Sequence, residues 1–139
     1  MSAKTIIAAI AFGLIAGGCA PMRTGAAVNC KDGGACKIVV TVVDDCRISV
    51  DPPVLDVYGP HVIQWDIAGN VSSYTFADDG IAFKEDTKQE FFGRSPGPSK
   101  FIWIDRNAIA RSAPYGYTVK VMKGSTACKP LDPGIINHG

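Results

Sequence analysis

The chain has 139 residues, of which 47% are hydrophobic and 19% are charged. This length suits one compact domain, and the apolar content is too high for a disordered chain. Fourteen Lys and Arg residues against thirteen Asp and Glu residues give a net charge of +1, which argues against a dedicated nucleic-acid-binding protein, because such a protein normally has a strongly basic face.

The N-terminal stretch MSAKTIIAAIAFGLIAGG, residues 1–18, has the pattern of a secretory signal peptide. Lys4 precedes an apolar stretch from Ile6 to Ala16, and small residues follow. The apolar stretch is shorter than the roughly 20 residues that a membrane-spanning helix needs. It has no amphipathic stripe, which argues against the alternative of a helix within the fold.

The cleavage region, residues 14–20 (LIAGGCA), resembles the lipobox of bacterial lipoproteins, in which small residues precede a cysteine. In that family the cysteine is acylated, with palmitate among its chains, and becomes the first residue of the mature protein. The resemblance implies that Cys19 is lipidated, and that Ala20, in place of Asp, directs the protein to the outer membrane. Ala16 departs from the pattern, because a larger aliphatic residue is commoner there. Ordinary cleavage after Ala20 or within residues 25–27 is the alternative.

The count of cysteines agrees with export. If Cys19 is acylated, four of the five cysteines remain, and an even number in an exported chain predicts two disulfides. A zinc site is the alternative, but no C-x-x-C pair is present. The flexible turn between Cys30 and Cys36 (KDGGA) favours a bridge between them, which leaves Cys46 to pair with Cys128. Residues 19–29 are predicted to be a lipidated tether.

Residues 30–139 are predicted to form one domain of short strands separated by turn residues. Residues 37–43 (KIVVTVV) are β-branched almost throughout, which favours a strand buried on both faces. Alternation places Ile63, Trp65 and Ile67 on one face of a later strand, and it likewise places Tyr115, Tyr117, Val119 and Val121 on one face of the last strand. Only residues 105–112 are compatible with a helix. The predicted strands, in chain order, are residues 37–43, 47–50, 54–58, 61–67, 73–76, 81–83, 90–92, 100–104 and 115–122.

Seven or more short strands at this spacing predict an antiparallel β-sandwich. A bridge from Cys46 to Cys128 would join the ends of the first and last predicted strands, which favours a parallel, side-by-side placement of these two strands. Residues 101–107 (FIWIDRN) and 115–121 (YGYTVKV) loosely resemble the closing strands of cupredoxin-like and immunoglobulin-like domains. The predicted fold class is therefore an all-β, disulfide-stapled Greek-key sandwich.

Because cupredoxin-like domains often bind copper, the resemblance makes a copper site a candidate. A type 1 copper site uses two His, a free Cys and usually a Met. Residues 105–114 occupy the place of the ligand-bearing loop and contain none of these residues, so no metal or cofactor is expected. His61 is expected to be partly buried at the start of its strand, and His138 is expected to be exposed in the C-terminal tail.

The sequence also does not indicate a hydrolase. The sequence has no G-x-S-x-G motif, and neither histidine has the context of a catalytic triad. The adjacent acidic pairs Asp44-Asp45, Asp78-Asp79 and Glu85-Asp86 would point to opposite faces of a strand or cap turns, rather than form a glycosidase pair. No catalytic residue is therefore predicted, and the protein is expected not to be an enzyme.

Residues 91–100 (FFGRSPGPSK) couple two aromatic residues to a cationic Gly/Pro loop. Exposed aromatic residues and arginines are preferred anchors at protein interfaces. Phe92, Arg94 and Lys100 are therefore candidate partner-binding residues. The alternative interpretation places one phenylalanine in the core and treats the rest as a plain hairpin connection.

Together these features predict a non-enzymatic, membrane-anchored lipoprotein on the periplasmic face of the outer membrane, acting as a binding or structural accessory. Its expected partners are the membrane, through the lipid anchor, and a protein of the envelope, with no nucleic acid. Tethering would raise the local concentration of the domain beside such a partner. The alternatives are a copper-handling periplasmic protein and an inhibitor of an envelope-directed enzyme.

Overall fold

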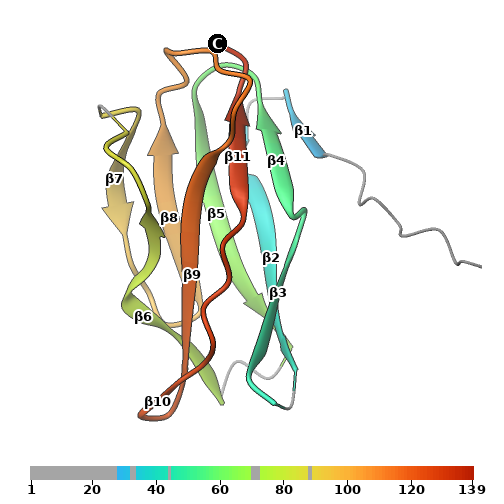
Figure 1. The fold of residues 1–139 in the computed structure, drawn as a ribbon, viewed down its shortest axis with the longest axis vertical. Coiled ribbons are helices and arrows are strands. Elements are labelled where there is room, and N and C mark those ends of the chain that lie inside the picture. Colours follow the sequence, from blue (N-terminus) through green and yellow to red (C-terminus); the bar gives the residue numbers. More distant parts are fainter. Residues whose placement is uncertain (1–27, 32–33, 44, 70–72, 88) are drawn as a thin grey trace, which may run out of the picture.

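A computed structural model describes residues 28–31, 34–43, 45–69, 73–87 and 89–139 (Figure 1). The predicted signal peptide and Cys19 lie outside these residues. The secondary structure of the described part consists of strands β1 to β11. No helix in these ranges is long and apolar enough to cross a membrane.

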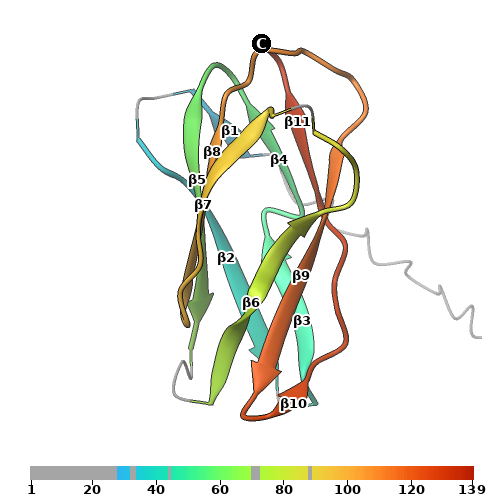
Figure 2. The ribbon, with the colours of Figure 1, turned by 90° about the vertical axis from the view of Figure 1, so that its left-hand side faces the viewer.

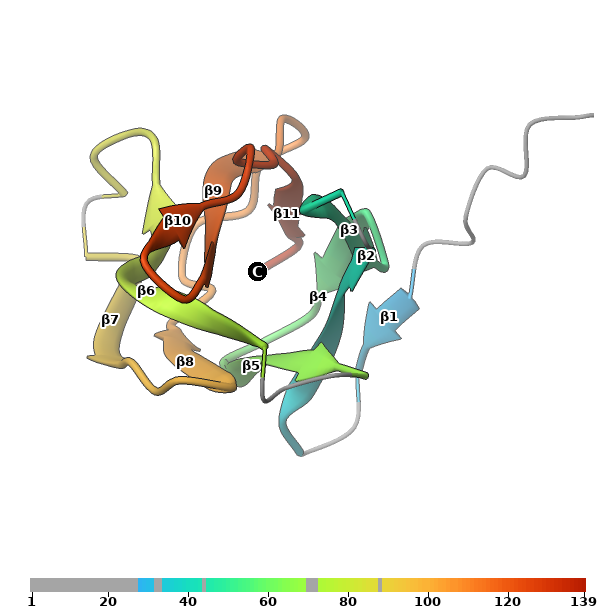
Figure 3. The ribbon, with the colours of Figure 1, turned by 90° about the horizontal axis from the view of Figure 1, so that it is seen from below.

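Two sheets pack face to face with the core between them, as Figures 2 and 3 show. One sheet has five strands in the order β3-β2-β5-β8-β7, and the other has six, in the order β1-β4-β11-β9-β10 with β6 also paired to β9. The five-stranded sheet contains β2 (Cys36–Val43), β3 (Arg47–Asp51), β5 (His61–Ala68), β7 (Phe91–Ser95) and β8 (Lys100–Asp105). The six-stranded sheet contains β1 (Val28–Cys30), β4 (Val54–Val57), β6 (Tyr74–Phe83), β9 (Tyr115–Lys123), β10 (Thr126–Ala127) and β11 (Gly134–Asn137).

The predicted all-β, disulfide-stapled sandwich is confirmed, but both sheets are mixed rather than purely antiparallel. Strand β2 runs parallel to β5, and β4 runs parallel to both β1 and β11. The remaining strand pairs are antiparallel. Parallel pairs arise here because the chain crosses from one sheet to the other between β3 and β4 before it returns in β5.

The core is built by inward-facing residues of both sheets. The predicted inward faces of β5 and β9 are confirmed, because their alternate residues are buried. Trp65 of β5 meets Tyr117 of β9 edge to face, with 5.4 Å between the ring centroids. Strand β2 also alternates, with Ile38 and Val40 buried and Val39 exposed. The prediction that residues 37–43 are buried on both faces is therefore wrong.

The two predicted disulfides, Cys30–Cys36 and Cys46–Cys128, are both formed, with Cα–Cα distances of 5.8 and 5.0 Å. Each one joins the two sheets. Cys30 ends β1 of the six-stranded sheet, whereas Cys36 begins β2 of the five-stranded sheet. Cys46 follows β2, and Cys128 follows β10 of the other sheet. Strands β2 and β9 therefore lie in different sheets, and their predicted side-by-side placement is wrong.

Several elements differ from the predicted ones. Residues 73–76 and 81–83 belong to one strand, β6, whose pairing with β9 shifts register between Phe76 and Ile81. Residues 106–112 follow β8 without forming a helix. Strands β1, β10 and β11 were not predicted, and β1 begins at Val28, inside the stretch expected to be a tether.

Candidate interaction surface

The solvent-facing side of the five-stranded sheet, called the outer face below, carries exposed apolar side chains. Val39, Val43, Val62 and Phe92 lie on it, each between 38% and 41% exposed. They account for four of the six large apolar residues that are exposed in the described part of the chain. An exposed apolar patch on a soluble domain is a common sign of a binding surface.

Strand register gathers part of this apolar surface into one cluster. Val62 of β5 lies opposite Ile104 of β8, and Ile104 lies opposite Phe92 of β7. Ile102, two residues before Ile104, faces the same side and is half-buried. Neighbouring strands are about 5 Å apart, so these side chains touch or nearly touch. We call Val62, Phe92, Ile102 and Ile104 the apolar strip.

Positive charge borders the apolar strip. The guanidinium carbon of Arg106 lies 5.2 Å from the centroid of the Phe92 ring, which is a cation–π arrangement. Lys100 lies opposite Asp66 of β5. The carboxylate of Asp66 accepts a hydrogen bond of 2.6 Å from Gln64. Lys100 precedes Ile104 by four residues, so it lies about 13 Å from the end of the strip that holds Phe92. Phe92 and Lys100 therefore both lie on the outer face, but at opposite ends of the row of side chains that runs along β8.

Arg94 follows Phe92 by two residues and is exposed. It lies in the irregular part of β7, where the pairing with β8 shifts register between Phe92 and Ser95. Gly93 has a φ of +63°, and a Cβ there would meet Ile104 at 2.9 Å, so this bend requires glycine. The charge of Arg94 acts on Asp79 of β6, where it adds a small contribution to the lowering of the Asp79 pKa.

The loop between β7 and β8 is fastened to both sheets. The backbone N–H of Phe76 in β6 donates to the carbonyl of Pro98 at 2.8 Å, and that of Ile67 in β5 donates to the carbonyl of Ser99 at 2.9 Å. These bonds tie the loop across one end of the sandwich. The loop is therefore part of the framework, while Phe92 on the neighbouring strand remains exposed.

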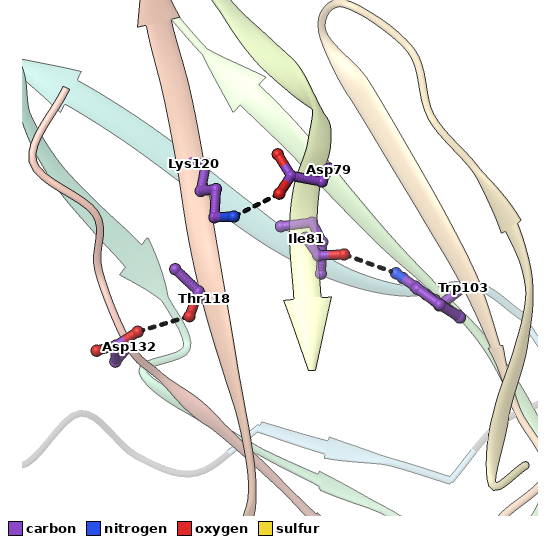
Figure 4. A network of polar contacts seen from close by, with 6 residues as sticks. All are labelled: Asp79, Ile81, Trp103, Thr118, Lys120 and Asp132. Carbon is purple, nitrogen blue, oxygen red and sulfur yellow. Dashed lines mark hydrogen bonds and ion pairs between the residues drawn. The ribbon is translucent and has the colours of Figure 1, made fainter. Parts of the chain in front are cut away.

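The solvent-facing side of the six-stranded sheet has a different character (Figure 4). Lys120 of β9 forms an ion pair and hydrogen bond with Asp79 of β6, and this contact is the largest cause of the lowered Asp79 pKa. Asp132 accepts a hydrogen bond from Thr118 at 2.8 Å and forms an ion pair with Lys84 at 2.7 Å. These polar side chains pair with one another, whereas four large apolar residues are exposed on the outer face.

The two histidines differ in environment. His61 is partly buried, as predicted, and its Nδ1 donates to the carbonyl of Gly59 at 2.9 Å. His138 is exposed, as predicted, and its Nε2 lies 2.7 Å from Oδ1 of Asp56. Its ring also stacks on Tyr58, with centroids 4.2 Å apart and planes 6° apart. The C-terminal tail is therefore held against β4.

A buried polar cluster near the carboxyl terminus was not predicted from the sequence. It consists of Glu90, Asp105, Asn107 and Asn137, which are all buried. Burial is the main cause that raises the pKa of Asp105 to about 6. The signal in the sequence was an acidic residue at an inward position, two places after the inward Trp103, at the end of an otherwise apolar strand.

The part of the chain that the structure describes contains no group of three or more His, Cys, Asp or Glu side chains able to hold a metal ion. Comparison with protein-family models and with curated protein sequences finds no match for this chain.

Proposed function

We propose that this protein is a lipid-anchored accessory protein of the bacterial envelope, which binds an envelope protein through the apolar strip of its outer face. The lipobox-like sequence around Cys19 and the two disulfides support export and anchoring. The contrast between the apolar outer face and the ion-paired opposite face supports binding, and it is the observation on which the binding proposal depends.

The anchor would hold the domain close to the membrane. Strand β1 begins nine residues after Cys19, and nine residues span at most about 30 Å. Such a tether restricts the search for a partner to a thin layer beside the bilayer. A partner in or on the same membrane would therefore be bound at an effective concentration far above its average one.

Charge complementarity indicates the chemistry of the partner. Arg106 and Lys100 border the strip, and Lys37 lies on the same face in the row that contains Ile102. Asp66 offers a carboxylate beside these three cations and already accepts a bond from Gln64, and Asp51 on β3 offers a second one two strands away. The matching surface on the partner would present apolar side chains with carboxylates around them.

The anchor is tested by mass spectrometry of the protein purified from bacterial membranes. The expected mature chain begins at an acylated Cys19, and a Cys19→Ser variant carries no acyl chain and leaves the membrane fraction. An intact N-terminal methionine, cleavage after Ala20, or an unmodified Cys19 sulfur would contradict the anchor.

The binding surface is tested by photo-crosslinking in cells, with the photoreactive residue at position 104 in one protein and at position 120 in a matched control. We expect one discrete adduct from position 104 and none from position 120. A Phe92→Ser substitution should reduce that adduct at least about tenfold, and a Lys100→Glu, Arg106→Glu pair should do the same if the partner is acidic.

Equal adducts from both positions, or an adduct unchanged by these substitutions, would disprove the proposed surface. An adduct with twice the mass of the protein itself would identify a second copy of the chain in place of an envelope protein, and would likewise overturn the proposal. Met122→Ser on the opposite sheet is the matched control for loss of apolar surface.

A further inference from the structure

The buried cluster near the carboxyl terminus has a carboxyl group at its centre. Asp105 is fully buried, and its Oδ1 accepts two hydrogen bonds, one from the backbone N–H of Asn107 and one from Nδ2 of Asn137, both 2.9 Å long. Asn137 belongs to β11, so this contact joins the end of the five-stranded sheet to the last strand of the six-stranded sheet.

Two oxygen atoms of this contact have no hydrogen-bond partner among the residues that the structure describes. They are Oδ2 of Asp105 and Oδ1 of Asn137, and both are buried. An ionised carboxylate and an amide oxygen are acceptors only, so neither can satisfy the other. Leaving two buried acceptors unpaired is costly, and buried polar atoms in native proteins are nearly always paired.

One hydrogen atom would satisfy both oxygens. A protonated carboxyl group and a primary amide are complementary, because each offers one donor and one acceptor on the same edge. The amide nitrogen of Asn137 already donates to Oδ1 of Asp105, so the amide lies beside the carboxyl group. We propose that in the folded domain Asp105 keeps its proton at mildly acidic pH and donates it from Oδ2 to Oδ1 of Asn137, so that the Asp105–Asn137 contact is a pH-sensitive clasp.

The surroundings of Asp105 agree with a retained proton. Burial raises the pKa of Asp105 to about 6, although the hydrogen bonds from Asn107 and Asn137 act in the opposite direction. The charge of Glu90, which is 2% exposed, raises this pKa further, whereas His61 in register on β5 lowers it. Strand β11 contributes the neutral Asn137 to this environment.

The clasp holds several parts of the chain together. Nδ2 of Asn107 donates to the carbonyls of Val57 and Gly59 at 2.9 Å each, and its Oδ1 accepts from the backbone N–H of Gly139 at 3.0 Å. Asn107 is in turn bonded to Asp105. Ionisation of Asp105 would remove the donor to Asn137, and would loosen β11 and the C-terminal residues from the turn between β4 and β5.

The direction of the effect follows from linkage. The pKa of Asp105 rises from an ordinary value of 3.8 to about 6 on folding, so the folded domain binds the proton more tightly than the unfolded chain. The resulting stabilisation is complete below pH 3.8 and is lost as the pH rises through about 6. A shift of about two pKa units changes the folding equilibrium constant about 100-fold.

The direct test is a carbon NMR titration of the Asp105 carboxyl group in the isotope-labelled mature protein. We expect a midpoint near pH 6, and a change in the side-chain amide signals of Asn137 with the same midpoint. A midpoint at or below the ordinary value of about 3.9 would overturn the proposal. This test is independent of the lipid anchor and of the apolar strip.

Asp105→Asn supplies a second readout, because its amide can donate to Asn137 at every pH. Between pH 4 and pH 7 the folding equilibrium constant should fall about 50-fold more in the natural protein than in the variant. Because histidines titrate between about pH 5 and 8, both proteins are also compared in a His61→Gln background. Equal pH dependence in both proteins would overturn the proposal. If the Asp105→Asn variant does not fold, the NMR titration of the natural protein decides alone.

Discussion

Phe91 and Phe92 are neighbours in β7 but point to opposite sides of the five-stranded sheet, and they are 5% and 40% exposed. The Phe91 ring stacks on Phe83, with 4.0 Å between centroids, and meets Tyr115 edge to face. Phe92 faces solvent beside Arg106. The first of these aromatic residues therefore stabilises the core, and the second is available to a partner.

Substitution of each phenylalanine should separate stability from binding. Phe91→Ala removes a buried ring and is expected to lower the free energy of unfolding by about 3–5 kcal/mol. Phe92→Ala is expected to change it by less than about 1 kcal/mol, because the site is exposed. Urea denaturation measures both changes, and similar losses in the two variants would contradict the assigned faces.

Trp103 and Ile81 join the two sheets through one hydrogen bond, because the indole Nε1 of Trp103 donates to the carbonyl of Ile81 at 3.2 Å (Figure 4). Trp103→Phe keeps most of the ring and removes the donor, so it should cost about 0.5–1.5 kcal/mol of unfolding free energy. Lys120→Ala is the control, and this variant should leave the denaturation midpoint nearly unchanged, because surface ion pairs contribute little. An unchanged midpoint in Trp103→Phe would show that this hydrogen bond contributes nothing.

The two disulfides should differ in their contribution to stability. Cys46 and Cys128 are 82 residues apart, and Cys30 and Cys36 are six residues apart. In the chain-entropy model, removing the long bridge by a double Ser substitution costs about 4–5 kcal/mol, and removing the short bridge costs about 2 kcal/mol. Thermal unfolding of both double variants tests this order, and a larger loss from the short bridge would refute it.

Glu90 should tune the titration of Asp105. Glu90→Gln keeps an oxygen that can accept the bond from the backbone N–H of Ala108 and removes the negative charge. The pKa of Asp105 should therefore fall, and the domain should lose less stability between pH 4 and pH 7 than the natural protein. Glu85→Gln, at an exposed ion pair with Arg111, is the control and should leave the Asp105 titration unchanged. A rise in the Asp105 pKa in Glu90→Gln would contradict the electrostatic assignment.

The sequence was informative where a strand has one buried face. The alternation in β5 and β9 predicted their core residues, because polar residues mark the solvent side of each strand. In β2 the solvent side holds Val39 and Val43, so composition alone suggested burial on both faces. The same valines that misled the prediction belong to the outer face, where apolar residues are exposed.

Long-range pairing explains the other differences. Asp78-Asp79-Gly80 has the composition of a turn, yet β6 continues through it, because β9 pairs with residues on both sides. Strand β11 is short and begins with Gly134, and it forms because β4 and β9 offer it partners. The Asp105–Asn137 contact joins residues 32 positions apart, which no local pattern can indicate.

The position of Cys30 has a mechanical consequence. A pull on the amino terminus would first load β1, a three-residue edge strand that pairs with β4. Cys30 ends that strand and is bonded to Cys36, the first residue of β2, which lies between β3 and β5 in the opposite sheet. The pulling force would thus be transmitted through the Cys30–Cys36 disulfide to β2, an interior strand of the opposite sheet. The strands at the edge of the domain would therefore be protected from being pulled away one after another.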